Sequence, residues 1–262
     1  SNLDCKFSII IVNDASTEDS SINNSNLSNI QSIKIINMKE NIGHARCIAT
    51  GLKYIFEKEE FDYVIPMDGD GEDRAEEIKN FVEHINYSPN KTIVGERIKR
   101  SEGLFFKICY SFHKILTLTF TGKNIKFGNY TCLPKSTVEK MINDKASWSS
   151  FSGSLEKVDN DKSSTPSIRG ERYFGPSKMS FKNLVLHSLS IISVFKISVL
   201  LRSILFLAIY MFLIYEKISI IMLIPALAVI GLVFSVFFIS KRENLNNFKN
   251  SLSNISKIDK IK

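Results

Sequence analysis

Apolar and polar residues follow one another along the first half of the chain in blocks that predict strands and helices in turn. Short β-branched runs are typical of buried strands, and apolar residues three or four apart are typical of amphipathic helices. The predicted strands are Lys6–Asn13, Ile33–Asn37, Tyr63–Met67, Thr92–Val94 and Phe127–Leu133. The predicted helices are Ala45–Glu57, Glu76–Ile85, Leu104–Thr121 and Thr137–Asn143. This order predicts an α/β fold, a Rossmann-like sheet with helices on both faces.

The pattern changes in the last third of the chain. Asp159–Ser167 is polar and predicts a loop, and Ser167–Tyr173 predicts an edge strand. Phe181–Phe195 mixes apolar and polar residues, as an amphipathic helix at a membrane interface does. Two apolar segments then follow around a Glu216-Lys217 turn, and we expect them to form a transmembrane hairpin because a span needs about 20 apolar residues. The tail, Glu243–Lys262, is rich in Asn, Ser and Lys and is expected to be mobile or a short surface helix.

The distribution of charged residues along the chain indicates which classes of molecule it binds. The chain has 34 Lys and Arg against 27 Asp and Glu, a net charge of +7, and its basic residues gather near the apolar segments as well as in the soluble part. This distribution favours a membrane surface or an anionic substrate over nucleic acid. Lys and Arg flank both ends of the hairpin, so the positive-inside rule predicts a cytoplasmic soluble domain on a membrane protein with two spans.

An acidic stretch carries the first candidate chemistry. Asp68, Asp70, Glu72 and Asp73 fall within six positions directly after the apolar run Tyr63–Met67. Carboxylates at the carboxyl edge of a sheet lie where open α/β folds bind ligands, and oxygen ligands suit Mg²⁺ or Mn²⁺. The alternative interpretation is a solvated acidic turn in which Asp73 caps the following helix.

Three further groups are candidates for binding, each with a plainer alternative. Asp14 ends a strand and is either a contact to a nucleoside or a turn residue. Arg46 lies in the first turn of a helix and is either a diphosphate ligand or a solvated side chain. A basic cluster of Arg169, Arg172, Ser177 and Lys178 is either a phosphate cradle or a juxtamembrane collar on anionic lipid, and both roles are compatible.

Five motifs in order give the chain a resemblance to the family 2 glycosyltransferases of the GT-A fold, and most closely to membrane-anchored polyprenyl-phosphate glycosyltransferases. The motifs are Val12-Asn13-Asp14-Ala15-Ser16-Thr17-Glu18-Asp19, Asn41-Ile42-Gly43-His44-Ala45-Arg46, Asp68-Gly69-Asp70-Gly71-Glu72-Asp73, Gly95-Glu96-Arg97 and Arg172-Tyr173-Phe174-Gly175-Pro176-Ser177-Lys178. A two-helix hairpin after the catalytic domain is also usual in that family.

The resemblance implies an enzyme that transfers a sugar, with inversion, from a nucleotide-sugar donor to a membrane lipid. Asp14, Asp68 and Arg46 would hold the nucleotide, Asp70 with Asp68 would hold the metal, and Asp70 and Arg97 would be catalytic. Arg172, Ser177 and Lys178 would bind the acceptor phosphate. The expected regions are a glycosyltransferase domain at 1–180, an interfacial helix at 181–198, a hairpin at 199–240 and a cytoplasmic tail at 241–262.

The sequence departs from the family pattern at three places. It lacks an opening strand that ends in Pro-x-Tyr-Asn-Glu, so that either the sequence is truncated or the protein is impaired. Asn13 replaces the first Asp of a pair, and Asn129 lies where many relatives have a carboxylate. Two alternatives therefore stay open: a transferase acting on a glycolipid or surface-polysaccharide intermediate, and an inactive membrane-bound protein that binds nucleotide sugars. The sequence also leaves a homo-oligomer open.

Overall fold

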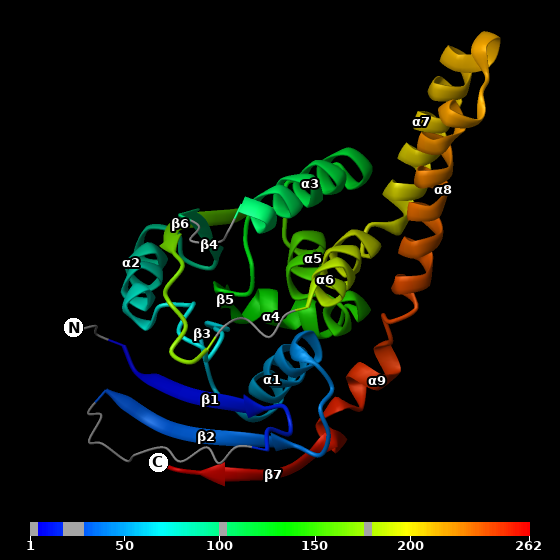
Figure 1. Cartoon of the computed structure of the whole chain (residues 1–262). Coiled ribbons are helices and arrows are strands. Elements are labelled where there is room, and N and C mark those ends of the chain that lie inside the picture. Colours follow the sequence, from blue (N-terminus) through cyan, green and yellow to red (C-terminus); the bar gives the residue numbers. More distant parts are fainter. Residues whose placement is uncertain (1–4, 18–28, 100–103, 176–179) are drawn as a thin grey trace.

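A computed structural model describes residues 5–17, 29–99, 104–175 and 180–262 of the chain (Figure 1). The strands are β1 Phe7–Asn13, β2 Ile30–Met38, β3 Tyr63–Val64, β4 Thr92–Lys99, β5 Thr131–Pro134, β6 Lys162–Ile168 and β7 Ile255–Lys260. The α-helices are α1 His44–Lys58, α2 Ile78–Tyr87, α3 Leu104–Thr121, α4 Lys135–Ile142, α5 Phe151–Val158, α6 Phe181–Ser193, α7 Lys196–Ile214, α8 Ile220–Ser240 and α9 Leu245–Lys249. The expected mixed α/β fold is confirmed.

The strands form two sheets. One has the order β1-β2-β7, with β1 and β2 parallel and β7 antiparallel to β2. The other has the order β3-β5-β4-β6, in which only β4 and β6 are parallel. The polar segment predicted as a loop contains β6. Along this strand Thr165 and Ser167 are buried, whereas its other residues are exposed or partly exposed. The edge strand predicted at Ser167–Tyr173 is accordingly wrong, since β6 ends at Ile168.

Helices cover both faces of the four-stranded sheet. Neighbouring residues of a strand point to opposite faces. On β4, Val94 packs in a cluster with residues of α1, α4 and α5, whereas Ile93 packs in a second cluster with Phe81 of α2. Leu133 and Cys132 of β5 divide between the same two clusters. The helices α1, α4 and α5 therefore lie on one face of this sheet, and α2 lies on the other.

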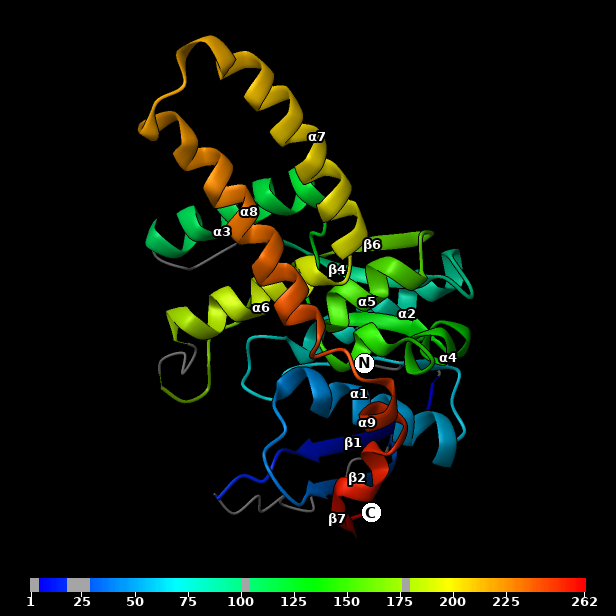
Figure 2. The ribbon, with the colours of Figure 1, turned by 90° about the vertical axis from the view of Figure 1, so that its right-hand side faces the viewer.

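The hairpin of α7 and α8 extends away from both sheets (Figures 1 and 2). Both helices are long and apolar enough to cross a membrane. Large apolar side chains on them are exposed, including Phe212, Ile220 and Phe234. At its base the hairpin packs on α3 and α6, where Ile192, Val199 and Val236 are buried in one cluster.

The segment after the hairpin corrects the prediction of a mobile tail or a surface helix. It returns through α9 to the soluble part, and β7 pairs with β2 from Lys34 to Met38 (Figure 1). Phe248 of α9 is buried and stacks on Trp148, with ring centroids 5.6 Å apart. The polar composition hid this strand because its partner lies more than two hundred residues earlier in the chain, out of reach of any local pattern.

We expect Phe248→Ala to detach the tail. Removing a buried Phe side chain costs about 3–5 kcal/mol, and Trp148 loses its stacking partner. Since Trp148 is the only tryptophan, its fluorescence reports the change directly: the emission should shift to the red and the melting temperature should fall. Phe234→Ala is the control, because Phe234 lies on α8 and is 73% exposed. An unchanged emission spectrum for Phe248→Ala would contradict the packing.

Glu243 gives the base of the hairpin a pH dependence. Its side chain is 4% exposed, and Lys145 Nζ lies 3.6 Å from one carboxylate oxygen. Burial raises the pKa of Glu243, and the nearby Lys196 and Lys145 only partly offset this. A carboxyl group whose pKa is raised by folding destabilises the protein when ionised, above its folded pKa, and this penalty vanishes below the ordinary value of about 4.3.

Glu243→Gln should therefore raise the melting temperature in detergent at pH 7.5, and the gain should disappear near pH 4. The matched control is Glu60→Gln, because Glu60 is 99% exposed beside Lys135 and should show no gain at either pH. A lower melting temperature for Glu243→Gln at pH 7.5 would show that the ion pair outweighs the burial.

Candidate functional site

The acidic stretch lies after β3 and folds into a tight turn held by its own carboxylates. Asp70 accepts a hydrogen bond from the Glu72 amide at 3.0 Å, and Asp73 accepts one from the Asp68 amide at 2.9 Å. Asp73 is 4% exposed, and Arg97 of β4 lies 3.5 Å from its other oxygen. Asp73 does not cap the next helix: η1 (Ala75–Glu77) begins after Arg74 without a side-chain cap. Asp73 instead fixes the shape of the turn.

The segment after β6 packs directly on this turn. The Gly170 amide donates to the Glu72 carbonyl and the Tyr173 amide to the Asp70 carbonyl, both at 2.9 Å. Gly71 has a φ of 92°, and a Cβ at Gly170 would lie 2.3 Å from the Gly71 carbonyl oxygen. Both glycines are therefore required by the close approach of the two backbones.

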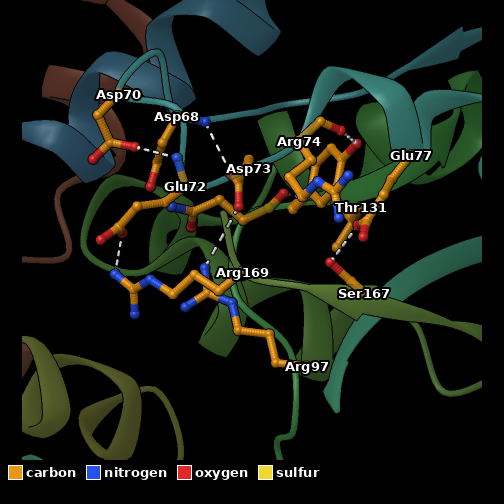
Figure 3. A network of polar contacts seen from close by, with 12 residues as sticks. Asp68, Asp70, Glu72, Asp73, Arg74, Glu77, Arg97, Thr131, Ser167 and Arg169 are labelled. Carbon is orange, nitrogen blue, oxygen red and sulfur yellow. Dashed lines mark hydrogen bonds and ion pairs between the residues drawn. The ribbon is translucent and has the colours of Figure 1, made fainter. Parts of the chain in front are cut away.

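Two arginines of that segment bind the acidic turn. Arg169 forms a short ion pair with Glu72 (Figure 3), and Arg172 Nε donates to the other Glu72 oxygen at 3.0 Å. Arg172 Nη2 also lies 2.9 Å from Asp70 Oδ2. Burial acts to raise the pKa of Glu72, but the two guanidinium groups outweigh it and lower the pKa. Glu72 is thus ionised and shared between two cations.

His44 approaches the turn from the first residue of α1. Its Nε2 lies 2.9 Å from Asp68 Oδ1 and 3.4 Å from the Asn129 amide nitrogen. The hydrogen bond to Asp68 raises the pKa of His44, against the effect of burial. Burial lowers the pKa of the His187 imidazole in α6, on which the charges of His44 and Asp68 also act.

Two of the residues predicted to bind the nucleotide have structural partners. The Asp14 carboxylate accepts the amides of Ile42 and Gly43, at 2.7 and 2.9 Å, and so fixes the turn into α1. The Arg46 guanidinium lies over the Trp148 ring, 5.5 Å from its centre. Their contacts to a nucleotide remain predictions.

The predicted site residues fall into three groups. Asp68, Asp70, Arg97 and Arg172 come together in the network of the acidic turn, whereas Asp14 and Arg46 hold the start of α1. Ser177 and Lys178 lie outside the described residues. Sequence reasoning missed His44, and it named Glu72 and Arg169 in separate clusters without predicting that they pair. His44 follows the glycine of a strand-to-helix turn, which is the one local signal that could have marked it.

The carboxylates of the acidic turn are ligands of the kind that a divalent cation prefers, but in this structure they pair with Arg169, Arg172 and His44. Asp70 and Glu72 together bind one guanidinium, and Asp68 binds an imidazole, so the turn collects positive charge on carboxylate oxygens. Within the part of the chain that the structure describes, no three His, Cys, Asp or Glu side chains converge as a ready metal site. A metal on Asp70 would share this carboxylate with Arg172 or replace Arg172 there.

Comparison with protein families gives one match. The sequence model described as Glycosyl transferase family 2 matches residues 2–149, a stretch that contains β1 to β5, the acidic turn and Arg97. A comparison with curated proteins found no match.

We expect Glu72→Gln to loosen the segment after β6. Two arginines would lose a charged partner in a place where Glu72 is 12% exposed, which costs about 1–3 kcal/mol. Amide hydrogen exchange at Gly170 and Tyr173 should speed up. Glu76→Gln is the control, since Glu76 is 73% exposed beside Arg74. Equal exchange rates in the two variants would show that the backbone contacts alone hold the segment.

Proposed function

The chain belongs to glycosyl transferase family 2, and we propose that it transfers a sugar from its nucleotide-sugar donor to the phosphate of a polyprenyl phosphate. The general activity, glycosyl transfer from a nucleotide sugar, comes with the family. The proposal adds the lipid phosphate as acceptor, inversion at the anomeric carbon and dependence on Mg²⁺ or Mn²⁺. It also places α7 and α8 in the membrane, with the soluble part on the cytoplasmic side.

The observation that carries the proposal is that α6, which has exposed apolar side chains, continues almost directly into the hairpin. The charges of His44 and Asp68 also act on the pKa of His187 in that helix. Phe181 and Val185 of α6 are exposed, at 57% and 40%. A helix with exposed apolar side chains at the base of a membrane hairpin lies at the lipid interface, where the head group of a lipid acceptor would arrive.

Asn129 supports an acceptor that is already ionised. A hydroxyl acceptor needs a general base to take its proton, and the amide of Asn129 beside His44 cannot serve as one. A phosphate oxygen can attack the anomeric carbon as an anion. The new bond joins that oxygen to the anomeric carbon, and the bond to the leaving nucleoside diphosphate breaks on the opposite face.

The residues of the acidic turn would stabilise the leaving group. Asp70 with Asp68 would hold the divalent cation, whose charge neutralises the diphosphate as it leaves. Arg172, once displaced from Asp70, is free to bind phosphate oxygens, and Arg97 stays beside Asp73 to orient the turn. Preorganised charge of this kind is worth a factor of about 10²–10³ in rate per group.

The test is transfer of labelled sugar by the purified chain in detergent, with a panel of nucleotide sugars. We expect a charged lipid product with polyprenyl phosphate and none with polyprenol, which has the same tail without the phosphate. Asp70→Asn should lower kcat by about 10²–10³-fold. Asp161→Asn is the control, because Asp161 is 77% exposed in a surface pair with Lys91.

Three outcomes would overturn parts of the proposal. Transfer to a glycolipid or polysaccharide intermediate, but not to polyprenyl phosphate, would replace the acceptor. Unchanged transfer by Asp70→Asn, or full activity in the presence of a chelator, would remove the metal. Binding of nucleotide sugar without transfer to any acceptor would favour the inactive binding protein.

A further inference from the structure

Arg46, one of the predicted nucleotide ligands, is oriented by an aromatic ring. Its guanidinium lies over Trp148, 5.5 Å from the centre of the ring, and among the described residues no carboxylate forms an ion pair with it. Burial and the charge of Arg242, another cation, lower the pKa of Arg46. A guanidinium held on a ring face keeps its N–H donors for an acceptor such as a phosphate oxygen.

Trp148 is in turn held by the segment that follows the membrane hairpin. Its ring stacks on Phe248 of α9, with centroids 5.6 Å apart and planes 23° apart. Trp148 is 6% exposed and Phe248 is 1% exposed, and both pack in one cluster with Ala49 of α1. Arg46, Trp148 and Phe248 therefore form one chain of contacts from the start of α1 to α9.

β7 reaches the turn that carries the other predicted ligand, Asp14, through a chain of side-chain amides. Asp259 of β7 accepts a hydrogen bond from the Asn37 amide, and Asn37 accepts one from the Asn13 amide, both at 2.9 Å. Asn13 Oδ1 accepts the Ser16 backbone amide, also at 2.9 Å. These hydrogen bonds cross all three strands of the sheet and end in the turn after β1.

The turn after β1 has a backbone that needs to be held in place. Ala15 has a φ of 54°, in a region that residues with a Cβ rarely adopt. Asn13 fixes the turn because it donates to Asn37 and accepts from Ser16. An aspartate at position 13 would have no donor for Asn37 Oδ1. The asparagine that departs from the family pattern therefore fits the strand that the tail contributes.

We propose that the segment after the hairpin takes part in donor binding, with Phe248 and Asp259 as positioning residues. Phe248 acts through Trp148 on Arg46, and Asp259 acts through the two asparagines on the turn that carries Asp14. The Asp14 carboxylate accepts two backbone amides and keeps further lone pairs for a nucleoside hydroxyl. The inference rests on the proposed function, because it requires a nucleotide donor at Asp14 and Arg46.

The first experiment measures nucleotide affinity without any acceptor. Uridine, guanosine, cytidine and thymidine diphosphates are titrated with Mg²⁺ onto the 262-residue chain in detergent by calorimetry, and the tightest binder is kept. We expect Phe248→Leu and Asp259→Ala each to raise its Kd about three- to tenfold, since each removes one positioning contact. Asp259→Asn keeps an acceptor for Asn37, and the Kd should stay within about twofold of the unaltered value.

Two matched variants control for the loss of an ion pair and of a cation–π contact. Lys257→Ala removes the 3.1 Å ion pair with Asp259 but leaves Asn37 bonded to that carboxylate. Phe61→Leu removes a ring that lies 5.5 Å from Lys135 Nζ, the same distance as in the Arg46 contact. Both variants should leave the Kd unchanged.

A double variant distinguishes positioning of Arg46 from a general loss of stability. Arg46→Gln should raise the Kd by itself, and adding Phe248→Leu should raise it no further, because no guanidinium is left for the ring to orient. Effects that multiply in the double variant would overturn the inference, and so would a Kd that neither Phe248→Leu nor Asp259→Ala changes.

The inference and the proposed acceptor can fail separately. Nucleotide binding that depends on Phe248 and Asp259, without transfer to polyprenyl phosphate, would keep the inference and remove the acceptor. Transfer to polyprenyl phosphate with a Kd that the tail variants leave unchanged would do the reverse. Absence of binding for every nucleoside diphosphate would overturn both.

Discussion

The candidate site depends on one ionised carboxylate held between two arginines. Glu72 binds Arg169 and Arg172, and through them the segment after β6 lies against the acidic turn after β3. The backbone contacts at Gly71 and Gly170 set how close the two loops come, and the ion pairs set which cations the turn holds. Without Glu72, Asp70 would be the only carboxylate of the turn paired with Arg172.

The carboxylates of the acidic turn can therefore pair with either of two kinds of positive charge, a guanidinium group or a divalent metal ion. Arg172 neutralises Asp70 in the structure described here, and a divalent ion bound with a donor diphosphate would compete for the same oxygens. Because Glu72 keeps its hold on the Arg172 Nε atom, the guanidinium would stay at the site when it leaves Asp70. It would then be placed to meet a phosphate, which links the two roles proposed for this residue.

Much of the fold could be predicted from the sequence, because it rests on local patterns. The helices α1 to α4 and α6 to α8 follow apolar periodicity or length, and β1 and β2 follow β-branched runs, whereas α5 was not predicted. The two missed strands share one physical cause. β6 is a strand because β4 pairs with it, and β7 is a strand because β2 does; both are polar segments whose partners are distant in the chain. β3 pairs with β5 over only two residues, although its apolar run is longer.

The residues of the candidate site likewise divide into those that local motifs mark and those that only long-range contacts reveal. Asp68, Asp70, Arg97 and Arg172 could be named from motifs, but their partners could not, because contacts such as Arg172 to Asp70 join segments a hundred residues apart. His44 was overlooked because a single histidine has no pattern of its own. Asp14 was identified as important, and the structure gives its carboxylate a role in holding the turn before α1.

The pairing of β7 with β2 also sets an order of events during synthesis. β2 leaves the ribosome early, whereas Ile255–Lys260 follows the whole of α7 and α8. If the hairpin enters the bilayer as it is made, the three-stranded sheet can close only afterwards. Until then, β2 keeps an open strand edge, and open edges invite wrong pairing. In that case membrane insertion would be a step in the folding of the three-stranded sheet.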